Sequence, residues 1–111
     1  MDFQEQPLVV TPTPTGFNVK LIGAVHTNNA WIEGEFKKIV AAKPADVALD
    51  LSATTFMSSS GVGLLVWLHN KLAEAGGAVR IVAIRKNVLT TLKYAQLARM
   101  LHADTATLAP G

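Results

Sequence analysis

Apolar and polar side chains alternate near the start of the chain, which is typical of strands that bury one face. Residues 8–11 read LVVT, and residues 17–21 read FNVKL, where every second side chain is apolar. The stretch PTPTG between them contains proline and glycine, which supply the backbone angles of turns. The pattern predicts a β-hairpin whose second strand ends at Gly23.

The spacing of apolar residues then changes to that of a helix. One apolar stripe with a period of 3.6 residues contains Ile32, Phe36, Ile39 and Val40. We expect this helix to begin near Ala30 and to end at Lys43-Pro44-Ala45, because proline cannot continue a helix. Side-chain oxygens able to cap its first turn belong to Thr27, Asn28 and Asn29.

Two strand–helix units follow. Residues 47–51 alternate as a strand, and residues 60–75 have helical spacing up to the pair Gly76-Gly77. Glycine ends helices because it adopts the left-handed C-cap conformation without a Cβ clash. Residues 78–84 form an apolar run that only Arg80 interrupts, which is typical of a strand covered on both faces.

A third helix is expected to begin with Asn87 as its cap and to continue to Leu101, after which the tail either adds a short edge strand or frays. The order β-β-α-β-α-β-α predicts an α/β fold with a mainly parallel sheet. We expect one domain over residues 1–111, with its core at about 8–101, a mixed sheet of four to five strands, and three or more helices packed against it.

Composition and charge exclude several classes of function. The net charge of +2 comes from 10 basic and 8 acidic residues that are scattered, whereas binding of nucleic acid needs a dense basic patch. No apolar run is long enough to cross a membrane, and the start lacks the features of a signal peptide. We therefore expect a cytoplasmic protein without direct contact to nucleic acid and without membrane insertion.

Catalytic and cofactor motifs are missing from the sequence. There is no cysteine, and the histidines His26, His69 and His102 stand far apart without metal-ligand spacing. The hydrolase motif G-x-S-x-G is absent, and the third glycine of a dinucleotide fingerprint that starts at Gly61 would fall on Val66. We expect no catalytic residues, no metal and no cofactor, and we interpret the protein as a non-enzyme.

The most informative segment joins the strand 47–51 to the helix at residue 60. Three serines, Ser58, Ser59 and Ser60, precede Gly61 there. A helix start has unpaired N–H groups and a partial positive charge, so it accepts a capping oxygen or an anion. These serines are therefore caps, or one of them accepts a phosphoryl group. Small residues at Gly61 and Gly63 would let the helix start approach the sheet, or a partner, closely.

Two other side chains near this segment stand out. Asp50, at the end of the strand, is expected either to accept hydrogen bonds from loop N–H groups or to face a partner. Trp67 lies off the apolar stripe of its helix, on the side of Ser60 and Lys71, and tryptophan is enriched at interface hot spots.

The order of elements, together with LDLSATTFMSSSGVGLLVWL and AGGAVRIVAIRKNVLTTLKYAQLARML, resembles the STAS domain, the fold of the bacterial anti-sigma factor antagonists. Family members usually have a strand ending in Asp-Leu, then Met-Asp-Ser-Ser-Gly or Met-Asp-Ser-Thr-Gly, then Leu-Gly. The matching positions here are Asp50-Leu51, Met57-Ser58-Ser59-Ser60-Gly61 and Val62-Gly63. The resemblance extends from about Leu8 to Leu101.

The resemblance implies a regulatory protein-interaction module that binds an anti-sigma factor with serine kinase activity. Ser59 would be the phosphoacceptor, with Ser58 and Ser60 as second choices, and phosphorylation would release the partner. From the helical spacing, and not from the resemblance, we expect a docking face that contains Ser60, Leu64, Trp67 and Lys71, and Ser58 and Gly61 complete the expected partner surface. Whether the chain forms a homodimer stays open.

The sequence departs from the family pattern at two places. Ser58 replaces the usual Asp, and Ala24-Val25-His26 replaces the acidic residue that often follows the glycine after the second strand. These losses would also suit an alternative, a STAS scaffold that is not phosphorylated, such as a small subunit of a phospholipid-transport complex. A third hypothesis, a small serine hydrolase or nucleotide binder, lacks its motifs.

Overall fold

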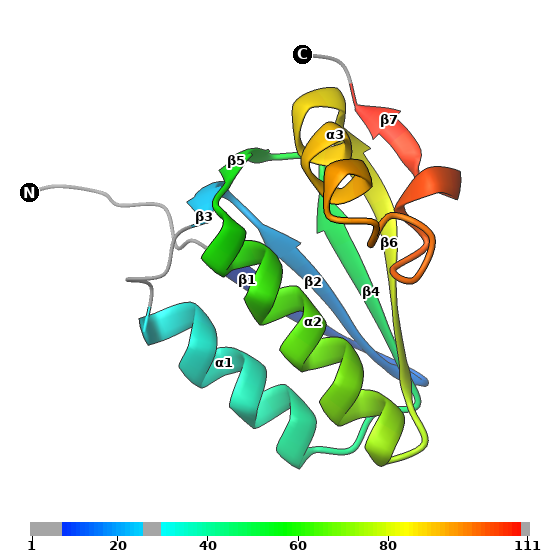
Figure 1. The fold of residues 1–111 in the computed structure, drawn as a ribbon. Helices are drawn as coiled ribbons and strands as arrows, with labels where there is room; N and C mark the ends of the chain where they lie inside the picture. The colour runs from blue at the N-terminus through cyan, green and yellow to red at the C-terminus, as the bar shows by residue number, and fades with distance from the viewer. Residues whose placement is uncertain (1–7, 26–29, 110–111) are drawn as a thin grey trace, which may run out of the picture.

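The computed structural model describes residues 8–25 and 30–109, and these form a single α/β domain, as predicted (Figure 1). The hairpin β1–β2, the first helix and the alternation of strands and helices are confirmed. The strands are β1 (Leu8–Thr13), β2 (Gly16–Leu21), β3 (Gly23–Val25), β4 (Asp46–Leu51), β5 (Thr54–Met57), β6 (Ala78–Arg85) and β7 (Thr107–Ala109). The helices are α1 (Ala30–Ala41), α2 (Ser59–Glu74), α3 (Lys86–Tyr94) and the 3₁₀ turn η1 (Ala103–Thr105).

Within the described residues, five strands form a mixed sheet in the order β1-β2-β4-β6-β7. β1 and β2 are antiparallel, and each of the pairs β2–β4, β4–β6 and β6–β7 is parallel. A parallel arrangement follows from the helical crossovers, which return the chain to the same end of the sheet. The parallel strands therefore end at one edge, where β5 and the start of α2 also lie (Figure 1).

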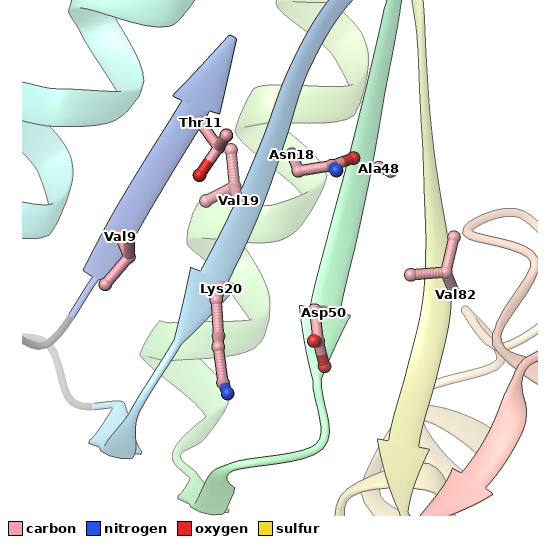
Figure 2. A pocket seen from close by; sticks show the side chains of 8 residues that line it. All are labelled: Val9, Thr11, Asn18, Val19, Lys20, Ala48, Asp50 and Val82. Atoms are coloured by element: carbon pink, nitrogen blue, oxygen red, sulfur yellow. The ribbon is translucent and has the colours of Figure 1, made fainter. Parts of the chain in front are cut away.

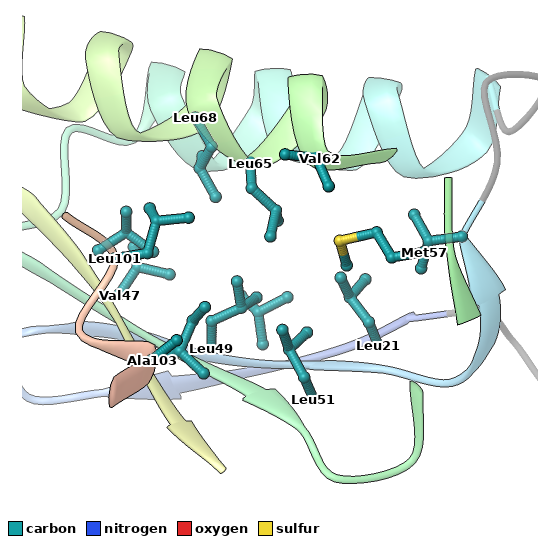
Figure 3. Packing of buried hydrophobic residues seen from close by; sticks show 14 of the residues in the cluster. Leu21, Val47, Leu49, Leu51, Met57, Val62, Leu65, Leu68, Leu101 and Ala103 are labelled. Atoms are coloured by element: carbon teal, nitrogen blue, oxygen red, sulfur yellow. The ribbon is translucent and has the colours of Figure 1, made fainter. Parts of the chain in front are cut away.

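The hydrophobic core lies between the sheet and the helices α1 and α2, which cover the same face of the sheet (Figure 1). Figure 3 shows strand residues such as Leu49 and Leu51 facing Val62, Leu65 and Leu68 of α2. Leu49, Leu51 and Leu68 are fully buried. Each such side chain contributes about 1.5–3 kcal/mol by leaving water, so this layer accounts for much of the stability.

The other face of the sheet is not covered by a helix, so the expectation that β6 is covered on both faces is wrong. Val79, Ile81 and Ile84 of β6 are buried, whereas Ala78 and Arg80 are exposed. The Arg80 guanidinium binds the Asp46 carboxylate, with Nε–Oδ1 and Nη2–Oδ2 distances of 3.2 and 3.1 Å. The apolar composition of β6 indicated two buried faces, but small and aliphatic residues also occur on an open sheet face.

The expected glycine stop at the end of α2 is confirmed. Gly76 has a φ of 83°, in the left-handed region. Its N–H donates to the Ala73 carbonyl at 3.1 Å, and the Gly77 N–H donates to the Leu72 carbonyl at 2.8 Å. This is the Schellman pattern, which satisfies carbonyls that the helix end leaves free. A Cβ at Gly77 would overlap the Pro44 carbonyl, so the end of α2 lies directly against the backbone that follows α1.

The third helix is shorter than expected. α3 ends at Tyr94, Arg85 occupies the N-cap position without a side-chain cap, and Asn87 lies inside the first turn instead of capping it. The chain reverses at Gln96, whose φ of 61° is left-handed. The apolar residues that follow, Leu97 to Leu101, pack against the core from a turn rather than from a helix. Their spacing indicated burial correctly, but it did not show that the helix is interrupted.

Two short strands were not expected. β3 and β5 pair in parallel and form a separate two-stranded sheet beside the main one. β3 begins at Gly23, with only Ile22 between it and β2, so this glycine starts a strand instead of ending one. The buried Thr54 side chain connects the two sheets, because its Oγ1 donates to the Leu21 carbonyl of β2 at 2.9 Å.

The remaining expectations concern the chain ends and loops. The tail was expected either to add a short edge strand or to fray. It adds the edge strand β7, which pairs with β6. The caps expected at Thr27, Asn28 and Asn29 lie outside the described residues. No helix in residues 8–25 and 30–109 is long and apolar enough to cross a membrane.

Replacement of Thr54 by valine tests the link between the two sheets. Valine has nearly the same shape, so Thr54→Val removes the hydroxyl donor without opening a large cavity. We expect a loss of about 1–2 kcal/mol in the free energy of unfolding, because the Leu21 carbonyl loses a buried hydrogen bond. Thr55→Val is the matched control, since Thr55 is exposed and should change stability by less than about 0.5 kcal/mol. Urea unfolding of both variants measures the difference, and equal stabilities would contradict the assigned role.

Candidate functional site

The start of α2 is held by a side-chain cap and by β3. Ser58 occupies the N-cap position with extended backbone angles, and its Oγ accepts a hydrogen bond from the Gly61 N–H at 3.0 Å. Its own N–H donates to the Val25 carbonyl at 3.0 Å. Serine and aspartate cap helices about equally well. Ser58 therefore supplies the same structural function that an aspartate would supply at this position.

Gly61 allows the first turn of α2 to approach the small sheet. It is buried, and an added Cβ would lie 2.8 Å from the Val25 carbonyl oxygen and 3.0 Å from Cγ of Met57. This confirms the expectation that a small residue brings the helix start close to the sheet. The structure thus places Gly61 under the helix, where a partner on the outer surface would not touch it.

Ser59 and Ser60 occupy different environments. Ser59 is the first residue of α2 and is exposed, and its hydroxyl has no hydrogen-bond partner among residues 8–25 and 30–109. Ser60 is half-buried. Ser59 also lies at the end of the helix where free N–H groups and the helix dipole favour negative charge. Of the three serines, Ser59 is therefore the hydroxyl most accessible to a modifying enzyme.

The other expected partner contacts flank this turn along α2. Leu64 and Trp67 are partly buried and pack against the core, so each offers only part of its side chain to a partner. The Lys71 Nζ lies 3.8 Å from Oε1 of Glu74, an exposed and weak ion pair. The structure thus places Ser60, Leu64, Trp67 and Lys71 on one flank of the helix, as the helical spacing predicts.

Gly63 belongs to the exposed face and was not among the expected contacts. It lies one turn after Ser59, it is exposed, and an added Cβ would meet nothing within 4 Å. Packing of the described residues therefore does not require glycine there. An exposed glycine inside a helix costs roughly 0.5–1 kcal/mol relative to alanine. A glycine that carries this cost without a packing reason is a candidate for a contact with a partner.

A shallow hollow lies on the open face of the sheet, away from α2 (Figure 2). Its volume is about 270 Å³, and it lies where the register of β4 and β6 shifts. It is lined by Val9, Thr11, Asn18, Val19, Lys20, Ala48, Asp50 and Val82. The Asp50 carboxylate accepts the Ser52 N–H at 2.8 Å, which confirms the local structural role expected of this residue. Because Asp50 lines this hollow, it lies on the opposite side of the sheet from α2.

A cluster of metal-ligating side chains in the described part of the chain would be another candidate site. No group of three or more His, Cys, Asp or Glu side chains could hold a metal ion among residues 8–25 and 30–109. His69 lies in the middle of α2 and His102 precedes η1, while His26 lies outside the described residues. What the turn at Ser58–Gly61 does offer is an exposed hydroxyl at a rigidly held helix start.

Comparison with known proteins identifies the fold. The family model described as the STAS domain matches residues 17–108. A search of curated proteins gave no match. The crystal structure of an anti-sigma factor antagonist from Mycobacterium paratuberculosis is similar to this chain, with a TM-score of 0.74 and 22% sequence identity over 94% of this chain and 85% of that chain.

A second solved structure has the same fold. It is the anti-sigma factor antagonist SpoIIAA in its unphosphorylated form, with a TM-score of 0.62 and 18% identity over 94% of this chain and 88% of that one. At these identities the two structures establish the shared fold, and the family model covers most of the chain. The chain with the serine-capped α2 therefore belongs to the STAS domain family.

Proposed function

We propose that this protein is an anti-sigma factor antagonist of the bacterial cytoplasm. In this proposal it binds an anti-sigma factor that is also a serine kinase, and phosphorylation of Ser59 releases that partner. The domain itself catalyses nothing and needs no cofactor. The similarity to two anti-sigma factor antagonists supports the assignment, one of them described in its unphosphorylated form.

The observation that carries the proposal is the environment of Ser59. The hydroxyl is exposed and free of hydrogen bonds within the described residues, while the cap that holds the helix start belongs to Ser58. Phosphorylation of Ser59 would therefore leave the cap intact. A phosphate adds about −1.5 to −2 charges at pH 7, and a helix N-terminus tolerates negative charge. The modified domain would keep its fold.

Release of the partner would then result from the cost of removing the Ser59 phosphate from water, and not from a conformational change of the domain. We propose that the partner covers the outer surface of α2 from Ser59 to Gly63, with Leu64, Trp67 and Lys71 at one side. A doubly charged group in the middle of such an interface is costly to remove from water unless the partner supplies compensating groups. The same phosphate that the free domain tolerates would therefore weaken the complex.

The two departures from the family pattern support the alternative of a scaffold that is not phosphorylated. Ser58 retains the cap but carries no negative charge, and Ala24 is an exposed residue of β3 paired with Phe56 of β5. If acidic groups at these places help a kinase to engage the antagonist, their loss would slow phosphorylation without changing the fold. A scaffold would use the same α2 surface and would be insensitive to negative charge at Ser59.

Charge at Ser59 separates the two functions. In the phosphorylation switch, Ser59→Asp should weaken binding of the anti-sigma factor by more than about tenfold, which corresponds to about 1.4 kcal/mol, whereas Ser59→Ala should bind constitutively. Isothermal titration calorimetry with each anti-sigma factor of the source organism measures the affinities. Mass spectrometry of the protein from its native cells, in the presence and absence of stress, reports whether Ser59 gains about 80 Da.

The stability of the Ser59→Asp variant is the control for this experiment. Ser59→Asp places a carboxylate in the first turn of α2, so it should leave the free energy of unfolding unchanged or raise it by about 0.3–1 kcal/mol. A loss of binding would then not result from unfolding. Wild-type affinity of Ser59→Asp, combined with weak binding of Trp67→Ala, would reject the switch and favour the scaffold.

Replacement of Gly63 by alanine tests whether a partner approaches this face of α2 closely. Gly63→Ala should raise the free energy of unfolding by about 0.5–1 kcal/mol, because its Cβ meets no other atom and alanine favours the helix. The same change should weaken binding of the anti-sigma factor. Gly34→Ala is the matched control, since Gly34 lies inside α1 with equally open space around it. It should stabilise the protein to a similar extent and leave the affinity unchanged.

Thermal unfolding and calorimetry on the same two preparations give both readouts. A Gly63→Ala variant that gains stability and keeps its full affinity would show that the partner does not contact α2 one turn after Ser59.

A further inference from the structure

The outer face of α3 forms a surface separate from the start of α2, which we call the α3 surface. It contains Arg85, Lys86, Asn87, Thr90, Lys93 and Tyr94. Val88 and Leu92 of the same helix are buried against the core, so the residues at the intervening positions face outward. α3 lies between β5 and β7 at the end of the domain where α2 begins (Figure 1).

The charge of the α3 surface is not balanced within the described structure. Residues 75–103 contain five basic residues and no acidic one. Of these five, Arg80 is paired with Asp46, but Lys86 and Lys93 have no ion pair among residues 8–25 and 30–109. By contrast, Lys37 and Lys38 of α1 are both paired with glutamates of their own helix. Within the described residues, two uncompensated lysines therefore lie on one helix, α3, whereas the unpaired Lys20 and Lys43 stand apart on β2 and after α1.

The α3 surface also has two wide and shallow depressions. One hollow of about 650 Å³ is lined by Thr55, Arg85, Lys86, Asn87 and Thr90. A second, of about 360 Å³, is lined by Thr90, Lys93 and Tyr94. Because both include Thr90, they form one path along the helix. No acidic side chain lines either hollow, and the groups that do are ammonium, guanidinium, hydroxyl and amide donors.

Hydrogen bonds hold the first hollow in shape. The Asn87 Nδ2 donates to the Thr55 carbonyl of β5 at 2.8 Å. The Arg85 Nε donates to the Ser52 carbonyl at 2.8 Å, in the loop between β4 and β5. At the other end of the path, the Tyr94 side chain is unusually open, with 86% of the residue exposed. Tyrosine is among the residue types most enriched at interface hot spots.

From this combination we propose that the α3 surface binds an acidic, extended segment of the protein partner. Lys86 and Lys93 lie seven residues apart on one helix, which at about 1.5 Å per residue separates them by roughly 10 Å. In the extended polyproline II conformation the chain has three residues per turn and rises about 3.1 Å per residue, so acidic side chains three positions apart lie on one face about 9 Å from each other and match the two lysines. The basic residues are too few for a membrane surface, where clusters of about 4–8 are typical, or for a nucleic acid.

The proposal rests on the proposed function only for the identity of the partner, and it specifies the chemistry of that partner. β5 joins the two surfaces, because Thr55 lines the first hollow and Ser58 caps α2 three residues later. A partner seated over Ser59 could therefore extend its acidic segment along α3. Charge complementarity of this kind increases association rate and specificity more than affinity.

The experiment uses the complete chain and a defined probe. The probe is a synthetic peptide of repeated Glu-Gly-Ser triplets, with a Gln-Gly-Ser peptide as its uncharged control. Two-dimensional ¹H–¹⁵N NMR titration at low salt should shift the amide signals of Lys86, Asn87, Thr90 and Lys93 with the acidic peptide only. Lys86→Gln/Lys93→Gln should weaken this binding by about tenfold, as the loss of two surface ion pairs predicts.

Lys20→Gln/Lys43→Gln is the matched control. It removes the same net charge from exposed lysines that have no ion pair in the described structure, on β2 and after α1, and it should bind the peptide as the wild type does. Equal weakening by both double variants would overturn the proposal, since attraction would then depend on net charge alone. Tighter binding of a DNA oligonucleotide or of phosphatidylglycerol vesicles than of the peptide would also overturn it.

The readout is independent of the Ser59 switch. Ser59→Asp should bind the peptide with wild-type affinity, so an intact peptide response with no effect of Ser59 on the anti-sigma factor would contradict the proposed function alone. Loss of peptide binding with an intact Ser59 switch would contradict the α3 surface alone.

Discussion

The Val25 carbonyl is the contact on which the position of the start of α2 depends. It accepts the Ser58 N–H, and it lies so close to Gly61 that a single Cβ there would overlap it. The first turn of α2 is thereby fixed against β3, and the Ser58 cap satisfies the Gly61 N–H from the other side. These contacts are made by Ser58 and Gly61, whereas Ser59 is exposed. A rigid helix start and an accessible hydroxyl thus arise from one local arrangement.

Much of the fold follows from periodicity, because strands of six residues and helices of three turns repeat their pattern often enough to be recognised. β3 and β5 contain only three and four residues, and they pair with each other, so no alternation distinguishes them from loops. The end of α3 carries no glycine or proline. Its left-handed residue is Gln96, and the N–H groups of Gln96 and Leu97 donate to the Lys93 and Leu92 carbonyls in the pattern that a glycine usually provides.

The sequence was sufficient to locate the candidate site, but it did not show the role of each residue in it. Three serines before a helix identify the turn, yet only the structure shows which one caps, which is half-buried and which is exposed. Gly61 and Gly63 look alike in sequence, although one is required by packing and the other has open space around it. The open face of the sheet was missed for a related reason: Val82 and Ala83 are apolar but only half-buried, and the charge of Arg80 is compensated by Asp46 instead of by solvent alone.

The contact of Gly77 with the Pro44 carbonyl has a mechanical consequence for α2. The C-terminal end of the helix is tied both to its own last turn and to the backbone that follows α1, and the Ala78 N–H extends this attachment by donating to Ala45. α2 is thus attached to the rest of the domain at both ends, through Ser58 and Gly61 at its start and through Gly77 at its close. A helix held in this way cannot slide or tilt without breaking one of these contacts. Ser59 therefore keeps one fixed position relative to the sheet.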